Sequence, residues 1–214
     1  MLKTTRIAVL VSGGGTNLQA LLDAQKRGEL PGGEIALVVS SKPGVYALER
    51  AEKAGVEALT VARKDYPDTE SFCAALLDTL KARAIDLVVL AGFLSILTPE
   101  FVRAYENRII NVHPALIPSF CGKGAYGLHV HEMALEYGVK VTGATVHFVT
   151  EGADEGPIIL QKAVDILPGD TPETLQRRVM EEAEWVLLPR AVALFCEGKL
   201  AVEGRRVIIE EEAQ

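Results

Sequence analysis

Short, almost entirely apolar runs alternate with helical hydrophobic periods along the first half of the chain. Residues 7–11, 35–39 and 87–90 are rich in β-branched side chains and are too short for helices. Strands without a polar face are buried on both sides, which is typical of a parallel sheet with helices on either face. The sequence therefore predicts an α/β protein with a mostly parallel central sheet flanked by helices.

The remaining elements follow from the same patterns. Further strands are expected at 58–61 and 109–112, and helices at 45–54, 69–82 and 129–136. Two longer strands are expected at 141–149 and 158–164, and a hairpin at 202–209. Thr171 and Pro172 have the chemistry of a helix start, which predicts one helix over 172–195. We expect one domain over residues 1–214, with both halves sharing one sheet.

Charge and cysteine content exclude several classes of protein. The 29 acidic residues outnumber the 22 basic ones and give a net charge of −7, which repels nucleic-acid backbones. No apolar run has the roughly 20 residues of a membrane span, and the first residues do not resemble a signal peptide. Three cysteines without a CxxC pair predict neither a disulfide framework nor a zinc site. A cytoplasmic protein is expected.

A glycine-rich turn follows the first strand. Gly13, Gly14 and Gly15 precede a helical period, so their backbone N–H groups could hold an anion, although such a turn can also be only a tight connection. Leu18 occupies the third glycine position of a dinucleotide motif, and residues 40–42 lack the ribose-binding acid. The turn therefore favours a monophosphate over NAD, and Gly15→Val is expected to raise the KM for a phosphorylated substrate.

Three polar residues form a second candidate group. Asn111 and His113 lie on the same side of a strand end, where open α/β sheets bind ligands. An amide and an imidazole there could stabilise an oxyanion and transfer a proton, or could merely bond loop backbone. Asp154 lies in a turn, which explains an aspartate by itself. If the fold brings it to His113, its charge would raise the pKa of the imidazole.

Structural roles are expected for the other histidines. His129 and His131 point in different directions around a helix, which disfavours a metal site, and His147 is expected in the core or in a pocket wall. Trp185 is expected in the core. The glycines of residues 120–127 predict a mobile loop there.

Taken together, four segments resemble the phosphoribosylglycinamide formyltransferase (GAR transformylase) family. They are residues 12–19, 89–94, 110–118 and 146–159, and the resemblance extends over about residues 6–200. It implies a Rossmann-like formyltransferase fold. It also implies transfer of a formyl group from 10-formyltetrahydrofolate, a co-substrate, to the amine of glycinamide ribonucleotide in purine biosynthesis, without a metal. The nucleotide-binding half would end at about residue 110, and residues 111–214 would form the folate-binding and catalytic half.

The resemblance also implies roles for individual residues. Asn111, His113 and Asp154 would be catalytic, with His113 kept protonated by Asp154. The nucleotide would contact Gly15, Thr16, Asn17, Glu181 and Glu184. The folate would contact Leu94, Ser95, Ile96, Leu97, Asn111, Thr150, Glu151, Gly152, Ala153 and Asp154. Both partners are small molecules, and the chain is expected to be a monomer or a homodimer.

The sequence departs from the family pattern at a few positions. Ser95 and Thr69 stand where arginine is frequent, Trp185 replaces a histidine, and Cys121 replaces a proline. The helix before Glu184 carries one extra residue.

Three alternatives remain at this point. Formyltetrahydrofolate deformylases resemble the same core but usually carry an N-terminal regulatory domain. Methionyl-tRNA formyltransferases carry a further C-terminal domain. A non-catalytic nucleotide-binding module would use the glycine turn but not the three polar residues.

Overall fold

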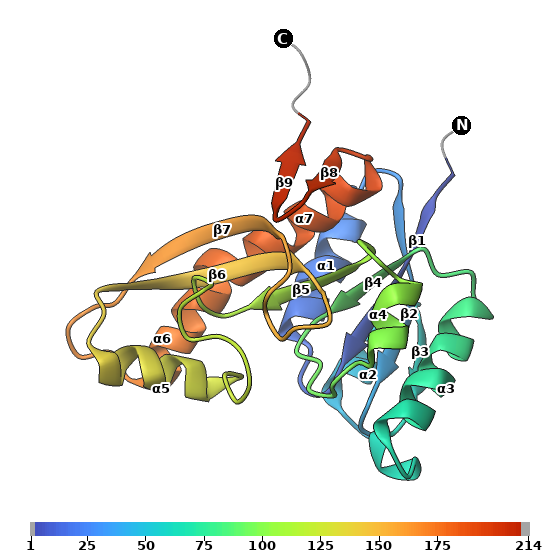
Figure 1. The fold of residues 1–214 in the computed structure, drawn as a ribbon, viewed down its shortest axis with the longest axis horizontal. Coiled ribbons are helices and arrows are strands. Elements are labelled where there is room, and N and C mark those ends of the chain that lie inside the picture. Colours follow the sequence, from blue (N-terminus) through green and yellow to red (C-terminus); the bar gives the residue numbers. More distant parts are fainter. Residues whose placement is uncertain (1–2, 211–214) are drawn as a thin grey trace.

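The computed structural model describes residues 3–210, and a nine-stranded sheet runs through the whole of that region (Figure 1). The strand order is β3-β2-β1-β4-β5-β6-β7-β9-β8. The strands are β1 (Thr5–Val11), β2 (Gly33–Ser40), β3 (Glu57–Thr60), β4 (Leu87–Leu90), β5 (Ile109–His113), β6 (Val141–Phe148), β7 (Ile158–Asp165), β8 (Leu200–Glu203) and β9 (Arg206–Ile209).

The first five strands in this order are parallel. Strand β6 then pairs antiparallel with both β5 and β7, whereas β7 pairs with β9 in parallel. The change of direction at β5 and β6 matches the change in sequence pattern after Asn111. The prediction of a mostly parallel sheet shared by both halves is confirmed. The expected terminal hairpin is present as β8 and β9, with Gly204 in its turn.

Helices cover both faces of the parallel part. Alternate residues of β1 face opposite layers: Ile7 and Val9 pack with α1, α2 and α7, whereas Ala8 and Leu10 pack with α3 and α4. This arrangement explains why β1 has no polar face. The helices are α1 (Thr16–Lys26), α2 (Tyr46–Lys53), α3 (Thr69–Lys81), α4 (Pro99–Ala104), α5 (Leu128–Tyr137), α6 (Pro172–Val179) and α7 (Trp185–Cys196), with a 3-10 turn η1 (Arg63–Asp65).

The helix predicted over 172–195 is interrupted. It begins as expected, because the Thr171 side chain and Thr174 form a reciprocal capping box. A π-helical turn, η2 (Met180–Glu184), then separates α6 from α7. A π turn takes one residue more than an α turn, which is how the helix absorbs the extra residue before Glu184.

Two short elements were not predicted from the sequence. Besides η1, helix α4 begins at Pro99 after the N-cap Thr98, whose side chain accepts a hydrogen bond from the Phe101 N–H. Thr98 and Pro99 repeat the start signal of Thr171 and Pro172, so this helix could have been found. Among the described residues, no helix is long and apolar enough to cross a membrane.

Candidate functional site

A cavity of about 230 Å³ lies at the carboxyl ends of β1, β4 and β5. Its lining combines residues from α1, the loop after β4, the end of β5, the start of α5, the β6–β7 loop and η2. Asn17, Leu94, Asn111, His113, Asp154 and Glu184 all contribute to it. The structure therefore brings together residues from the catalytic, nucleotide and folate sets that are up to 167 positions apart.

The carboxyl end of β5 carries Asn111 and His113. The β5–β6 pairing sets Asn111 opposite His147, and the Asn111 Nδ2 lies 3.1 Å from the His147 Nε2. The other ring nitrogen of His147, Nδ1, lies 2.8 Å from the Phe148 carbonyl, which can only accept. His147 thus carries its proton on Nδ1 when neutral and accepts from Asn111 at Nε2. One Asn111 N–H is held by this bond, and the second is left for another acceptor.

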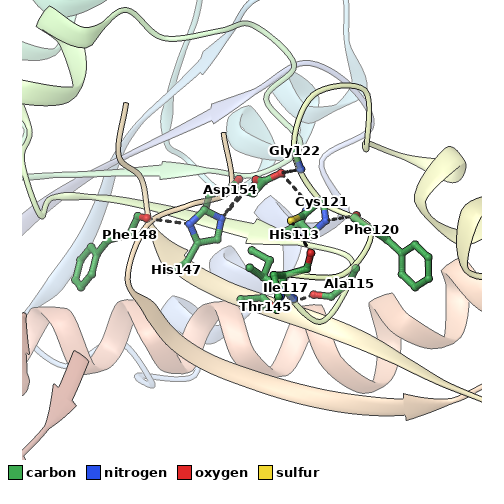
Figure 2. A network of polar contacts seen from close by, with 12 residues as sticks. His113, Ala115, Ile117, Phe120, Cys121, Gly122, Thr145, His147, Phe148 and Asp154 are labelled. Atoms are coloured by element: carbon green, nitrogen blue, oxygen red, sulfur yellow. Dashed lines mark hydrogen bonds and ion pairs between the residues drawn. The ribbon is translucent and has the colours of Figure 1, made fainter. Parts of the chain in front are cut away.

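His147 is the residue whose role the sequence did not predict. It is buried, as expected of a core histidine, and it contacts Asn111. It also faces Asp154 (Figure 2). The distance from its Nε2 to the Asp154 Oδ1 is 3.7 Å. Only the register of β5 against β6 shows this, and a single sequence does not state which strands pair.

Asp154 reaches the cluster from the β6–β7 loop. Its backbone has a φ of 56°, and the loop closes where Gly156 passes so near the Phe148 carbonyl that a Cβ would clash with it. The Asp154 Oδ2 accepts a 2.8 Å hydrogen bond from the Gly122 N–H and lies 3.7 Å from the His113 Nδ1. Burial raises the pKa of this carboxyl, but the contact with His147 in its protonated form, the Gly122 hydrogen bond and the charge of a protonated His113 outweigh it and hold the pKa below its usual value.

His113 is buried, and its protonation differs from the expectation. Its Nε2 lies 2.9 Å from the Phe120 carbonyl, while Asp154 faces its Nδ1 (Figure 2). Both neighbours favour the charged ring, yet burial dominates and lowers the pKa of His113 below 6.5. The expectation that Asp154 keeps His113 protonated is therefore wrong for this structure: at 3.7 Å, the carboxylate does not offset desolvation.

The glycine-rich turn lies at the start of α1. Ser12 binds Ser41 through its hydroxyl at 2.7 Å and accepts a 2.9 Å bond from the Leu94 N–H, which joins the ends of β1, β2 and β4. Arg50 donates to the Gly14 carbonyl at 2.8 Å. Nothing lies within 4 Å of where a Cβ would stand on Gly13 or Gly14, so an anion can approach their backbone.

Gly15 also has a structural role in the turn, while its predicted contact with the nucleotide stays a prediction. Its φ is 74°, and a Cβ there would lie 2.7 Å from the Ala47 Cβ on α2. A side chain at this position would strain the backbone and press α2 away from the turn. Gly15→Val would therefore disturb folding as well as ligand approach. A substitution at Gly13 or Gly14 is the better test of phosphate binding.

Of the three glutamates on η2, only Glu184 is buried, and it lines the cavity. The Asn17 Nδ2 donates a 2.6 Å hydrogen bond to its Oε2, so the start of α1 is tied to the end of η2. Burial raises the pKa of Glu184 to about 7. Glu181, by contrast, is exposed, and Met180 lines the cavity instead. The structure thus leaves Glu181 outside the cavity lining, on the π turn that carries Glu184.

The folate set occupies two loops beside the cavity. Leu94 and Ile96 expose 52% and 79% of their surface in the loop after β4, which is unusual for apolar side chains of this size. Glu151 is bound by Arg103 at 2.8 Å, so its side chain faces α4. Leu94, Asn111 and Asp154 line the cavity itself. The others lie in the two loops outside this lining: Ser95, Ile96, Leu97, Thr150, Glu151, Gly152 and Ala153.

The arrangement can bind an anion at one end and catalyse acyl transfer at the other. Backbone N–H groups at Gly13 and Gly14 suit a phosphate, and the free N–H of Asn111 suits an oxyanion beside the titratable His113. In the described part of the chain, no three His, Cys, Asp or Glu side chains are grouped as metal ligands.

Comparison with known proteins gives one family. The formyl transferase family model matches residues 5–192. A phosphoribosylglycinamide formyltransferase from Haemophilus influenzae is 38% identical over 208 residues, which are 97% of this chain and 95% of that protein. A trifunctional purine biosynthetic protein adenosine-3 from Drosophila pseudoobscura pseudoobscura is 48% identical over 91% of this chain, and the chain spans 14% of its length.

Solved structures give the same picture. Glycinamide ribonucleotide transformylase 1 from Symbiobacterium toebii superposes with a TM-score of 0.93 at 49% identity, covering 99% of this chain and 96% of that one. A formyltetrahydrofolate deformylase from Pseudomonas syringae pv. tomato has a TM-score of 0.88 at 29% identity, and it covers 98% of this chain but 67% of the deformylase.

Proposed function

The chain belongs to the formyl transferase family, and from this we propose that it transfers the formyl group of 10-formyltetrahydrofolate to the amine of glycinamide ribonucleotide, a step of purine biosynthesis. The observation that carries the proposal is one cavity lined both by Asn17, which lies in the first turn of α1 directly after the glycine turn, and by Asn111, His113 and Asp154. A deformylase acts on the folate alone and has no use for the phosphate-binding end.

The nucleotide would bind with its phosphate at the backbone of Gly13 to Asn17. The helix start of α1 supplies N–H groups and the positive end of a helix dipole. Glu184, mostly neutral at its raised pKa when the pH is below about 7, then meets the sugar without charge repulsion from the phosphate. Thr16 and Asn17 stand in the first turn of α1 beside it.

The folate would bind against the two loops beside the cavity. The exposed side chains of Leu94 and Ile96 offer an apolar surface for the pterin ring, and the backbone of residues 150–154 offers polar groups to its edge. The division into a nucleotide half up to about residue 110 and a folate and catalytic half from about 111 remains part of this proposal.

In the reaction, the amine nitrogen attacks the formyl carbon and an oxyanion forms. The free Asn111 N–H donates to that oxygen. His113, neutral at the start because burial lowers its pKa, takes the proton that the amine loses. Asp154 stabilises the imidazolium, and His113 then gives the proton to the departing folate nitrogen as the carbon–nitrogen bond breaks. His113 thus carries one proton from the amine to the folate nitrogen, while one carbon–nitrogen bond forms and another breaks.

The test is a product analysis of the purified chain with glycinamide ribonucleotide and 10-formyltetrahydrofolate. Mass spectrometry should show formylated nucleotide and tetrahydrofolate in equal amounts. Formate release without formylated nucleotide, at the same rate whether or not the nucleotide is present, would instead identify a deformylase. His113→Ala serves as the inactive reference, and no product with any nucleotide would overturn the proposal.

A further inference from the structure

His131, in the first turns of α5, is a fully buried histidine without a hydrogen-bond partner. Its exposed surface is 0%, and neither Nδ1 nor Nε2 has a partner among the described residues. Buried polar groups are nearly always paired, because an unpaired one loses its bonds to water without compensation. Two unpaired nitrogens on one ring therefore require an explanation.

The ring lines the cavity described above, together with His113, Met180 and Glu184. The Asn17 Oδ1 is also buried there without a partner. Three other titratable side chains of this lining are already bonded: His113 to Phe120, Asp154 to Gly122 and Glu184 to Asn17. Two residues of this lining, from separate helices, thus have unused hydrogen-bonding atoms.

The chemistry of His131 selects a neutral partner. Burial, with the nearby His113, lowers the pKa of His131 to about 4, so the ring is uncharged at neutral pH. A neutral imidazole has one donor and one acceptor. A hydroxyl group can bond to either nitrogen, whereas a phosphate can only accept from the N–H and gains no charge attraction from an uncharged ring.

We propose, resting on the proposed function, that His131 binds the nucleotide by hydrogen-bonding a hydroxyl group of its sugar. The phosphate belongs to the turn before α1 and the amine to Asn111 and His113, so the sugar lies between them. Asn17, Glu184, Met180, His131 and His113 all line the one cavity in which this sugar would lie. His131 is then a specificity residue for the sugar, in addition to Glu184.

His131→Leu tests this against a purely structural role. The variant should raise the KM for glycinamide ribonucleotide about tenfold, the effect of losing one or two hydrogen bonds, while the KM for the folate changes little. Its melting temperature should stay equal or rise, because two unpaired buried nitrogens are removed. His131→Asn, which keeps a donor and an acceptor, should restore much of the binding.

His129→Leu is the matched control. His129 lies on the same helix two residues earlier, is exposed and pairs with Glu132 at 2.9 Å, so the same substitution there should leave both KM values unchanged. An unchanged nucleotide KM in His131→Leu would overturn the proposal. An equal rise in the KM for both substrates would also overturn it, because that result indicates a packing defect.

Two measurements identify the hydroxyl and do not depend on turnover. By calorimetry, wild type should bind the nucleotide more tightly than His131→Leu does. This difference in affinity should disappear for either the 2′-deoxy or the 3′-deoxy analogue of the nucleotide. If the difference persists with both analogues, a sugar hydroxyl is not the partner of His131. In the wild-type protein, the nucleotide should shift the ¹⁵N signals of His131, whereas inorganic phosphate should not. No shift with the nucleotide refutes the proposal. If nucleotide binds but is never formylated, the proposed function fails and this inference still stands.

Discussion

The nucleotide end of the site, at the start of α1, and its reacting end, at the end of β5, are built differently. At the nucleotide end, Gly13 and Gly14 leave open space beside their backbone, and Asn17 keeps one unused oxygen. At the reacting end, His113 is bonded to Phe120 and Asp154 to Gly122. The first end is ready for its ligand, whereas the second must exchange protein contacts for substrate contacts. Nucleotide binding thus depends on the backbone at the start of α1, whereas the chemical step depends on the loop that begins at Phe120.

The largest expected effect comes from removing charge at the reacting end. Asp154→Asn keeps the shape of the side chain but removes the charge that stabilises the His113 imidazolium. We expect kcat to fall by about two to four orders of magnitude. NMR titration should show that the pKa of His113 falls further, because the Asp154 charge raises it.

Nucleotide affinity of Asp154→Asn, measured by calorimetry, should stay close to wild type. A large loss of affinity would contradict the separation of the two ends. A near-normal kcat with an unchanged His113 pKa would reduce Asp154 to a turn residue.

The second expected effect concerns stability at the nucleotide end. The pKa of Glu184 is about 7 when folded, against 4.5 for the free side chain, so the folded state holds its proton more tightly. The free energy of unfolding should therefore fall as the pH rises from 4.5 to 7, by up to about 3 kcal/mol. Glu184→Gln should lack this fall and be more stable than wild type at pH 8.

Urea unfolding at several pH values measures this difference. Glu181→Gln is the control, because Glu181 is exposed on the same turn. Parallel pH profiles for wild type and Glu184→Gln would show that Glu184 is ionised at no cost, contrary to its burial.

A third prediction concerns the glycine turn. Gly14→Ala adds a methyl group where the protein leaves space, so it should fold normally and raise the KM for the nucleotide about tenfold by blocking close approach. Gly15→Ala should mainly destabilise the fold, since its methyl group meets Ala47. Melting temperatures and KM values for both substrates separate the two results. Equal effects of both variants on stability would remove the distinction.

The smallest expected effect tests the loop at the reacting end. Gly122→Ala strains a backbone with a φ of 89° whose N–H binds Asp154, and kcat should fall several-fold with little change in nucleotide affinity. Gly124→Ala carries similar strain, with a φ of 92°, but Gly124 makes no bond to Asp154. Equal kcat values for the two variants would show that the Gly122 bond does not matter.

Periodicity and strand composition were sufficient to predict most of the sheet and its helices. The buried strands, the capped helix start at Thr171 and the hairpin at 202–209 each have a local signal, and the structure has them close to the predicted bounds. The π turn was visible only as an extra residue before Glu184. A sequence does not say whether an extra residue enlarges a helical turn or ends the helix.

The parts of the site that could be predicted are those whose residues lie close together in the sequence as well as in space. Asn111 and His113 come from one strand end, and the structure places both beside Asp154. The role of His147 depends on strand pairing, and the burial of His131 depends on the packing of α5 against neighbouring elements. The pKa of His113 depends on the balance between burial and a charge 3.7 Å away, which no spacing in the sequence reveals.

The hydrogen bond between Asn17 and Glu184 joins two residues that are 167 positions apart, so the second is synthesised long after the first. Strands β1 to β4 can begin to pair while the rest of the chain is still being synthesised, because domains fold progressively as they emerge. The nucleotide end, however, is complete only when η2 has emerged and docked against α1. A nascent chain that carries the entire glycine turn therefore lacks one wall of its binding site until about residue 184 has been added.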